Sequence, residues 1–202
     1  MNSQSAYNST DTAARKRELR SRFRLQRLSM DGIVWQAACV EIEQSVLSMK
    51  ELQSAQVVYS YVAFGREPST DGILSNLLQN GKTVVTPGIN HGTDPPDRLY
   101  QAVFQRTSDV ASPVVPGDIT DLTVRDVDIF LVPGIVWDQR GYRVGFGGGF
   151  FDRLLAQRKH DSLAVGLGFQ FQVLPELLVD SWDMPVDCLV TETSIIECVH
   201  NR

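Results

Sequence analysis

Short apolar stretches alternate along this chain with stretches of helical periodicity, and this alternation limits the folds that it can adopt. The clearest strand signal is VDIFLV at residues 127–132, which Pro133-Gly134 ends. Further strands are expected at 56–63, 82–87, 99–105, 163–167 and 186–191, and helices at 14–28, 33–52, 70–80 and 150–158. Strands that alternate with helices form a mostly parallel sheet covered on both faces. We therefore predict a three-layer αβα sandwich whose central strands are 56–63 and 127–132.

The length of 202 residues fits a single domain. The first 13 residues are polar, so we predict a disordered tail followed by one domain at residues 14–202. A Ser/Asn-rich start followed by arginines is also typical of organelle targeting segments, and that alternative stays open. The chain has no apolar run of 18 residues, so we expect neither a membrane span nor a membrane partner.

Charge and cysteine content narrow the class of protein further. The formal net charge of -5 argues against nucleic acid as the main partner. Cys39, Cys188 and Cys198 form no closely spaced pair, which fits a reducing compartment, and we expect a cytoplasmic protein. The three histidines show no metal-ligand spacing.

The most informative segment is a glycine-rich turn between the strongest strand and a predicted helix. It consists of Gly145, Phe146, Gly147, Gly148 and Gly149. Bare backbone N–H groups at a helix N-terminus favour phosphate binding, and such loops lie where open parallel sheets bind ligands. A merely flexible turn is the alternative, but the flanking Arg143 and Asp152 favour phosphate binding. A dinucleotide fingerprint would need glycine where this chain has Phe150, which disfavours a Rossmann-type dehydrogenase.

Residues 132–153, VPGIVWDQRGYRVGFGGGFFDR, resemble the signature of the 5-formyltetrahydrofolate cyclo-ligase family. That signature runs Pro-Gly-x-x-Phe-Asp-x-x-Gly-x-Arg-Leu-Gly-x-Gly-x-Gly-Tyr-Tyr-Asp, and the chain follows it without a gap. The chain departs from it with Trp137 in place of Phe and with Phe150-Phe151 in place of Tyr-Tyr. Some relatives also carry basic residues where this chain has Phe146 and Gly148. The resemblance covers residues 15–193 and is weakest at 88–125.

The basic segment at residues 15–27 contains seven Lys or Arg. On a helix, Lys16, Arg20 and Arg27 fall within about 40° of one another. A solvated face or a nucleic-acid-binding arm is the ordinary interpretation of such a run. However, Lys16-x-x-Leu19-Arg20 resembles the family's N-terminal motif, which implies that Lys16 and Arg20 bind the ATP phosphates. Three further arginines of the helix, Arg22, Arg24 and Arg27, are expected at the surface.

The segment after the first predicted strand is similar to the family's Glu-x-x-Thr motif, which implies that Glu67 contacts the folate. One carboxylate can accept two of the N–H groups on the edge of a pterin. A surface Glu in a turn is the alternative. Among the aromatic residues, we expect Trp137 and Phe151 to contact the folate, and Phe150 to pack in the core.

Residues 165–192 resemble the family's last block, in which Asp183 matches an acidic position. Asp152 and Asp183 are candidate Mg²⁺ ligands, because Mg²⁺ takes one or two carboxylates beside substrate phosphates. Two alternatives stay open: Asp152 as a carboxylate that only stabilises the helix dipole, and Asp183 as a structural turn residue.

The resemblance implies a fold similar to the NagB/RpiA/CoA-transferase-like proteins and an ATP-dependent ligase of one-carbon metabolism. In the family, the formyl oxygen of 5-formyltetrahydrofolate attacks the ATP γ-phosphate, N10 closes the ring, and 5,10-methenyltetrahydrofolate, ADP and phosphate leave. We expect Arg143 and Asp152 to be catalytic, ATP and Mg²⁺ to be required, and 5-formyltetrahydrofolate, with or without a polyglutamate tail, to be the partner. A monomer or homodimer is expected. A non-catalytic folate- or nucleotide-binding paralogue is the alternative.

Overall fold

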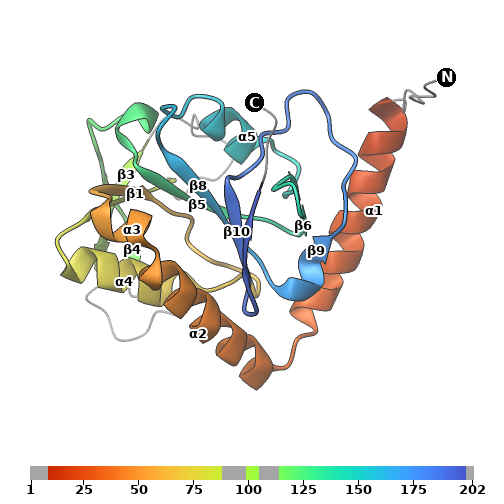
Figure 1. Ribbon diagram of the computed structural model, residues 1–202, viewed down its shortest axis with the longest axis horizontal. Helices are drawn as coiled ribbons and strands as arrows, with labels where there is room; N and C mark the ends of the chain where they lie inside the picture. The colour runs from red at the N-terminus through yellow and green to blue at the C-terminus, as the bar shows by residue number, and fades with distance from the viewer. Residues whose placement is uncertain (1–8, 88–98, 105–113, 199–202) are drawn as a thin grey trace.

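An eight-stranded sheet runs through the protein. The computed structural model describes residues 9–87, 99–104 and 114–198 (Figure 1). The strand order is β11-β10-β8-β5-β1-β2-β3-β4. The strands are β1 (Val57–Tyr59), β2 (Thr83–Thr86), β3 (Tyr100–Phe104), β4 (Val114–Ile119), β5 (Ile129–Pro133), β8 (Leu163–Leu167), β10 (Cys188–Val190) and β11 (Ile195–Glu197). From β10 to β2 the neighbouring strands are parallel, whereas β11, β3 and β4 join antiparallel. The prediction of a mainly parallel sheet with β1 and β5 at its centre is confirmed.

Helices cover both faces of this sheet, because its central strands are apolar on both sides. Val58, aligned with Val84 and Ile129, faces the helices α2 (Gly32–Ser48), α3 (Lys50–Ser54) and α4 (Asp71–Gln79). Tyr59 and Phe130 face the other side, where α5 (Phe150–Leu155) packs. Continuous apolar strands of this kind are expected when both faces of a parallel sheet are buried. The three layers agree with the sandwich predicted from the sequence.

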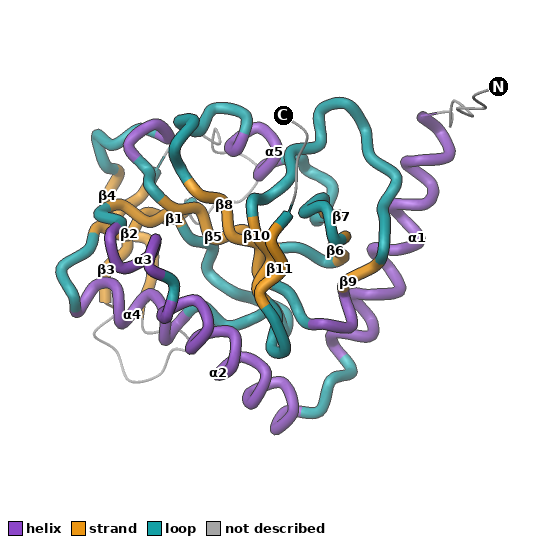
Figure 2. The backbone as a smooth tube through the Cα atoms, in the orientation of Figure 1, coloured by secondary structure: helices purple, strands orange, loops and turns teal. Residues whose placement is uncertain are grey.

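A second, smaller sheet carries the first helix at one end of the molecule (Figure 2). It has the order β7-β6-β9, formed by β6 (Val136–Asp138), β7 (Arg143–Val144) and β9 (Val173–Leu174). The helix α1 (Ser9–Leu28) buries Leu19 and Phe23 against an apolar cluster on this sheet, made of Ile135, Val136, Val144 and Leu177. The small sheet therefore holds α1 beside the carboxyl ends of β5 and β8.

Trp137 joins the two sheets from the centre of the core. Its side chain is 0% exposed. A Cβ atom added at Gly134, Gly166 or Gly168 would lie 2.5–2.7 Å from the indole ring. Side chains at these three positions would displace the ring, so the glycines form the space that Trp137 fills.

The element boundaries differ from the prediction in several places. Helix α1 begins at Ser9, so residues 9–13 are helical rather than disordered. The predicted helix 33–52 is broken at Met49, whose backbone is extended. The polar stretch 106–125 contains β4 and a 3-10 helix, Val124–Asp126. The predictions for residues 1–8 and for the loop 88–97 lie outside the described residues. Within the described part of the chain, no helix combines the length and apolarity needed to cross a membrane.

Candidate active site

A cavity of about 920 Å³ opens where α1, the turn after β1, the glycine-rich turn and the loop before β10 meet. This volume is within the range of small-molecule sites. All residues predicted for the site except Trp137 line it, namely Lys16, Arg20, Glu67, Arg143, Gly145, Phe146, Gly147, Gly148, Gly149, Phe151, Asp152 and Asp183. Four segments that are distant in the sequence thus contribute to one cavity.

The glycine-rich turn forms one wall and needs glycine at two positions. Gly147 has a φ of 105° and Gly149, which precedes α5, has a φ of 61°. Residues other than glycine rarely adopt either of these backbone conformations. Arg20 Nε donates to the Gly145 carbonyl at 2.7 Å, so a cation from α1 is fixed against this turn.

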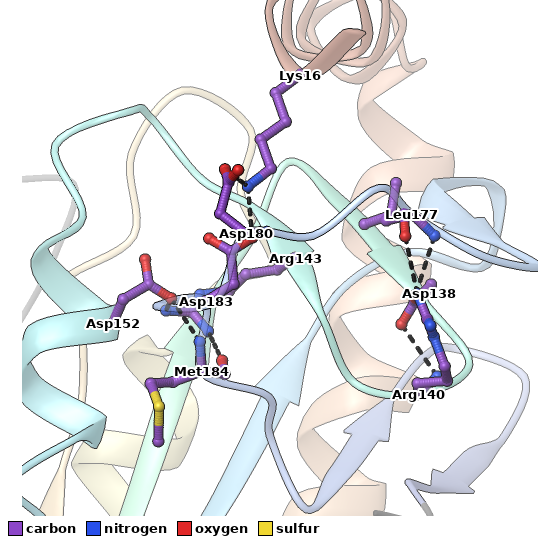
Figure 3. A network of polar contacts seen from close by, with 9 residues as sticks. All are labelled: Lys16, Asp138, Arg140, Arg143, Asp152, Leu177, Asp180, Asp183 and Met184. Atoms are coloured by element: carbon purple, nitrogen blue, oxygen red, sulfur yellow. Dashed lines mark hydrogen bonds and ion pairs between the residues drawn. The ribbon is translucent and has the colours of Figure 1, made fainter. Parts of the chain in front are cut away.

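Lys16 lies one turn before Arg20 on α1 and points to the loop that contains two aspartates (Figure 3). Its Nζ donates to Asp180 at 2.8 Å and also to Asp183, whose carboxylate accepts from the Asp180 N–H at 2.8 Å. Burial opposes the charge on Lys16, but the hydrogen bonds to the two carboxylates outweigh it, so the pKa of Lys16 lies above its usual value. One cation and two carboxylates therefore stand together at this wall.

Arg143 extends from β7 to the floor of the cavity, and its side chain is buried. It donates to Asp152 at 2.9 Å and to the Met184 carbonyl at 2.6 Å, while the Met184 N–H donates to Asp152 at 3.1 Å (Figure 3). Burial lowers the pKa of Arg143, and Asp152 and Asp183 oppose this effect. Because an arginine stays protonated in proteins, Arg143 supplies a fixed positive charge at the start of α5.

The fully buried carboxylate of Asp138 holds the turn before β7 in place (Figure 3). It accepts hydrogen bonds from the N–H groups of Arg140, Tyr142 and Leu177, each at 3.0 Å. The Arg140 guanidinium also donates to it, at 2.8 and 3.0 Å. Asp138 thus fixes the β6–β7 turn that positions Arg143, without lining the cavity itself.

Glu67 follows a turn in which Gly65 and Arg66 have positive φ angles. Its side chain is 2% exposed, and one oxygen accepts from the Phe64 N–H at 3.1 Å. Burial is the main influence on this carboxyl and raises its pKa to about 7, against the lowering effects of Arg27 and the Phe64 N–H. Arg27 is only 1% exposed, so its prediction as a surface residue is wrong. It is buried because it lies at the end of α1 that packs against the turn containing Gly134.

Phe150 and Phe151 do not divide between core and cavity as predicted. Both are half-buried, and both line the cavity. Their rings meet edge to face with centroids 5.4 Å apart, and Phe151 also meets Tyr59 edge to face at 6.0 Å. Only the placement of Phe151 at the cavity is confirmed; Phe150 shares that wall.

Two further differences concern aromatic residues. Trp137, predicted to contact the folate, is enclosed by the three glycines described above and does not line the cavity. Phe64, by contrast, was not predicted, and it stacks on Phe146 with centroids 5.0 Å apart at the exposed rim. Other lining residues that sequence reasoning missed are Arg17, Tyr61, Asp180 and Trp182. Their spacing carries no motif, so only the tertiary arrangement reveals them.

The two ends of the cavity differ in chemistry. Four lining cations, Lys16, Arg17, Arg20 and Arg143, together with the glycine-rich turn suit an anion with several oxygens. The buried carboxylate of Glu67 suits a ligand with N–H donors. Among the described residues, no group of three or more His, Cys, Asp or Glu is arranged to hold a metal ion. Asp152, Asp180 and Asp183 nevertheless all line the cavity, so carboxylate oxygens face the region of the cations.

The sequence of this chain is similar to those of known proteins over most of its length. The sequence profile of the 5-formyltetrahydrofolate cyclo-ligase family matches residues 12–192. A 5-formyltetrahydrofolate cyclo-ligase of Haemophilus influenzae is 27% identical over 190 residues, which cover 87% of this chain and 97% of that protein. The one from Mus musculus is 26% identical over 193 residues, which cover 89% and 94%.

Solved structures agree with the sequence comparisons. The NMR structure of Aquifex aeolicus 5,10-methenyltetrahydrofolate synthetase has a TM-score of 0.75 and 27% identity, covering 93% of this chain and 94% of that one. A synthetase structure from Mycoplasma pneumoniae has a TM-score of 0.68 at 22% identity, covering 88% and 98%, and it supports the fold alone.

Proposed function

Because this chain belongs to the 5-formyltetrahydrofolate cyclo-ligase family, we propose that its cavity binds ATP and 5-formyltetrahydrofolate side by side. The activity of the family, formation of 5,10-methenyltetrahydrofolate in folate metabolism, is the activity of this protein. The proposal concerns which residues carry it out. It assigns the cationic end of the cavity to the nucleotide and the Glu67 end to the folate.

At the nucleotide end, Lys16, Arg20 and Arg143 surround the glycine-rich turn and bind the ATP phosphates. Lys16 and Arg20 come from one face of α1, and Arg143 comes from β7. Charge-assisted hydrogen bonds from Lys and Arg to phosphate are short and strong. The glycine-rich turn, residues 145–149, lines the cavity beside them directly before α5, where the helix dipole also favours an anion.

At the folate end, Glu67 accepts hydrogen bonds from the amino-pyrimidinone edge of the pterin. The support is that Glu67 is buried, lines the cavity and has an oxygen, Oε1, without a hydrogen-bond partner among the described residues. Phe151 lies at the same cavity, where its ring can contact a flat heterocycle.

In the chemical step, the formyl oxygen of the folate attacks the γ-phosphorus and ADP leaves. The formyl carbon then carries a phosphate as leaving group. N10 attacks this carbon and loses its proton, and inorganic phosphate departs with the electron pair of the C–O bond. The protein contributes positioning and charge neutralisation rather than a nucleophile. We assign Arg143 to the transferring phosphoryl group, and Asp152 to holding the Arg143 guanidinium in place through their 2.9 Å hydrogen bond.

Mg²⁺ would be held by Asp152 and Asp183, together with ATP phosphate oxygens. The residues fit because Mg²⁺ needs only one or two protein carboxylates when phosphates and waters complete its shell. In addition, Lys16 neutralises only one of the two carboxylates that it contacts, Asp180 and Asp183. The ion would neutralise phosphate charge during transfer.

The proposed domain organisation is a single catalytic unit that includes the whole of α1, so it starts before the predicted boundary at residue 14. Its support is that one cavity is lined by residues from α1 to the loop before β10. Cys39, Cys188 and Cys198 are all buried free thiols, which supports the cytoplasm as the proposed location.

The observation that carries the proposal is the convergence of Lys16, Arg20, Glu67 and Arg143 on one cavity. The test is to mix the protein with ATP, Mg²⁺ and 5-formyltetrahydrofolate and to follow the absorbance of the methenyl product. We expect product only when all three are present. Binding of both substrates without product would show a non-catalytic paralogue, and no binding of either would contradict the proposal.

A further inference from the structure

Two buried charged groups from distant segments face each other beneath the cavity. Arg27 comes from the last turn of α1, and Glu67 comes from the turn after β1. Their side chains are 1% and 2% exposed, and the nearest atoms, a guanidinium nitrogen of Arg27 and Oε1 of Glu67, are 3.8 Å apart. This distance exceeds that of a hydrogen bond, so the two groups interact as charges only.

Each member of this pair has a polar atom that the described protein leaves without a hydrogen bond. These atoms are Nε of Arg27 and Oε1 of Glu67. A buried polar atom without a partner costs roughly 1–3 kcal/mol, and more when the group is charged. Glu67 also lines the cavity, so a bound ligand can supply the donor that its Oε1 lacks. Oε1 of Glu67 therefore lacks a hydrogen bond until a ligand binds.

Among the residues that the structure describes, the other groups near the pair do not provide a second compensating charge. Tyr61 donates its hydroxyl to the Pro68 carbonyl at 2.8 Å, and burial, with Glu67 as a second cause, raises its pKa well above the usual value. Tyr61 is therefore neutral. Arg24 acts on Arg27 and disfavours the charge there, in the same direction as burial. Trp35 Nε1 donates to the backbone carbonyl of Glu67 at 3.1 Å and leaves the carboxylate untouched.

We propose that Arg27 is a positioning residue for the folate, holding the Glu67 carboxylate in the charged form that accepts two pterin N–H groups. This inference rests on the proposed role of Glu67 in folate binding. Arg27 makes no contact with the substrate in this scheme and acts only through Glu67. Helix α1 would then serve both substrates: Lys16 and Arg20 bind the nucleotide, and Arg27, on the same face, acts on the folate.

The proposal predicts a specific pH dependence. A protonated carboxyl would present an O–H group to pterin donors and leave one of them unpaired. Because the pKa of Glu67 is about 7, folate affinity should increase as the pH rises through neutrality. The charge of Arg27 lowers the pKa of Glu67. Removal of Arg27 should therefore raise this pKa, and folate affinity should then increase at a higher pH than in the unmodified protein.

The experiment compares Arg27→Met, which removes the charge from a long side chain, with Arg27→Lys, which keeps the charge. The dissociation constant of 5-formyltetrahydrofolate would be measured by tryptophan fluorescence between pH 6 and 9, with that of ATP in parallel. Because about half of the Glu67 carboxyl is already protonated at pH 7, we expect Arg27→Met to weaken folate binding at this pH about fivefold if the pKa rises by one unit, and about fiftyfold if it rises by two. The affinity should approach that of the unmodified protein at the highest pH, and Arg27→Lys should stay close to it throughout.

Equal weakening by Arg27→Met at every pH would overturn the inference, because it would show a packing role alone. As a measurement that does not depend on a ligand, the ¹³C resonance of the Glu67 carboxyl should titrate at higher pH in Arg27→Met. If that variant does not fold, Arg27→Gln provides the same test with a polar neutral side chain. An unchanged Glu67 titration in either variant would also overturn the inference.

The variant Glu67→Gln separates this inference from the proposed function. If it abolishes the pH dependence of folate binding while Arg27→Met leaves that dependence in place, only the role of Arg27 fails. If Glu67→Gln binds folate with unchanged affinity and pH profile, Glu67 is not the folate group and the proposed function fails at this residue.

Discussion

At the scale of single residues, the site is made of charged groups whose partners come from distant parts of the chain. Lys16 shows this most clearly, because it is paired with Asp180 and Asp183 across the cavity while it remains accessible to a ligand there. The paired carboxylates fix the direction of the ammonium group before a nucleotide binds. Such preorganisation reduces the cost of ordering a flexible lysine in the complex.

Lys16→Ala should raise the KM for ATP by roughly tenfold to a hundredfold, since a hydrogen bond to a charged group contributes about 1.5–3 kcal/mol. The KM for 5-formyltetrahydrofolate should change much less. Arg22→Ala, at an exposed position of the same helix outside the cavity lining, is the matched control and should leave both constants unchanged. An unaltered KM for ATP in Lys16→Ala would show that this lysine only stabilises the acidic loop.

Trp137→Phe should lower the thermal stability without changing folate kinetics. The smaller ring leaves part of the space between Gly134, Gly166 and Gly168 empty, at a cost of roughly 1–3 kcal/mol, less than the 3–5 kcal/mol typical of truncation to Ala. Loss of the indole N–H, which is buried without a partner among the described residues, offsets part of that cost. Thermal unfolding and folate kinetics of the variant would be measured together. A raised KM for folate at unchanged stability would show that Trp137 contacts the substrate.

At the scale of elements, the glycine-rich turn depends on backbone conformation more than on side chains. Gly147 and Gly148 are neighbours in the same turn, but only Gly147 has a positive φ. A Cβ at Gly147 would also approach the Arg20 guanidinium at 3.4 Å, whereas one at Gly148 would meet no atom within 4 Å. Alanine at Gly147 would add backbone strain together with a methyl group, whereas alanine at Gly148 would add the methyl group alone.

Gly147→Ala should destabilise the protein by about 1–3 kcal/mol, the usual cost of holding a side chain in a strained backbone region. Gly148→Ala should leave the free energy of unfolding nearly unchanged or slightly increased, because alanine restricts the unfolded chain. Chemical denaturation of the two variants gives the comparison directly. Equal destabilisation would mean that the turn does not require the positive φ at Gly147.

Some elements of the fold could be predicted from the sequence alone, and others could not. The central strands β1 and β5 and the glycine-rich turn were predictable, because long apolar runs and glycine clusters are local signals. The small sheet β7-β6-β9 was not, because strands of two or three residues carry almost no periodicity. Arg27 was misplaced for another reason: a run of basic residues indicates a solvated surface, and only its tertiary partners Gly134 and Glu67 show that it is buried.

At the scale of the whole molecule, Asp128 connects neighbouring parallel strands near their amino ends. Its carboxylate accepts from the N–H groups of Gln56 and Val57 at 2.8 and 2.9 Å, and from Lys159 at 2.6 Å. Burial would raise the pKa of Asp128, but these hydrogen bonds outweigh it, so the pKa lies below the usual value. The carboxylate thus links the start of β1 to the segments before β5 and β8.

Asp128→Asn should lower the free energy of unfolding at neutral pH, and the deficit should vanish in acid. A carboxylate with a depressed pKa stabilises the fold above its unfolded-state value of about 3.9 and loses this contribution as the pH falls through the folded-state pKa. Denaturation curves from about pH 2 to pH 7 would check this, because the folded-state pKa lies below the usual value. Asp161→Asn, an exposed change of the same charge, is the control; a deficit independent of pH would contradict the electrostatic explanation.

The position of α1 has a consequence for how the protein is made. The hydrogen bonds that Lys16, Arg20 and Arg27 donate go to residues 107–167 positions further along the chain, at Gly134, Gly145, Asp180 and Asp183. At about 5–20 residues per second, a ribosome needs roughly 8–30 s to produce the last of them. Throughout that time Leu19 and Phe23 lack the surface that buries them in the finished protein. The nucleotide end of the cavity therefore cannot form on the nascent chain until the loop that contains Asp180 and Asp183 has been translated.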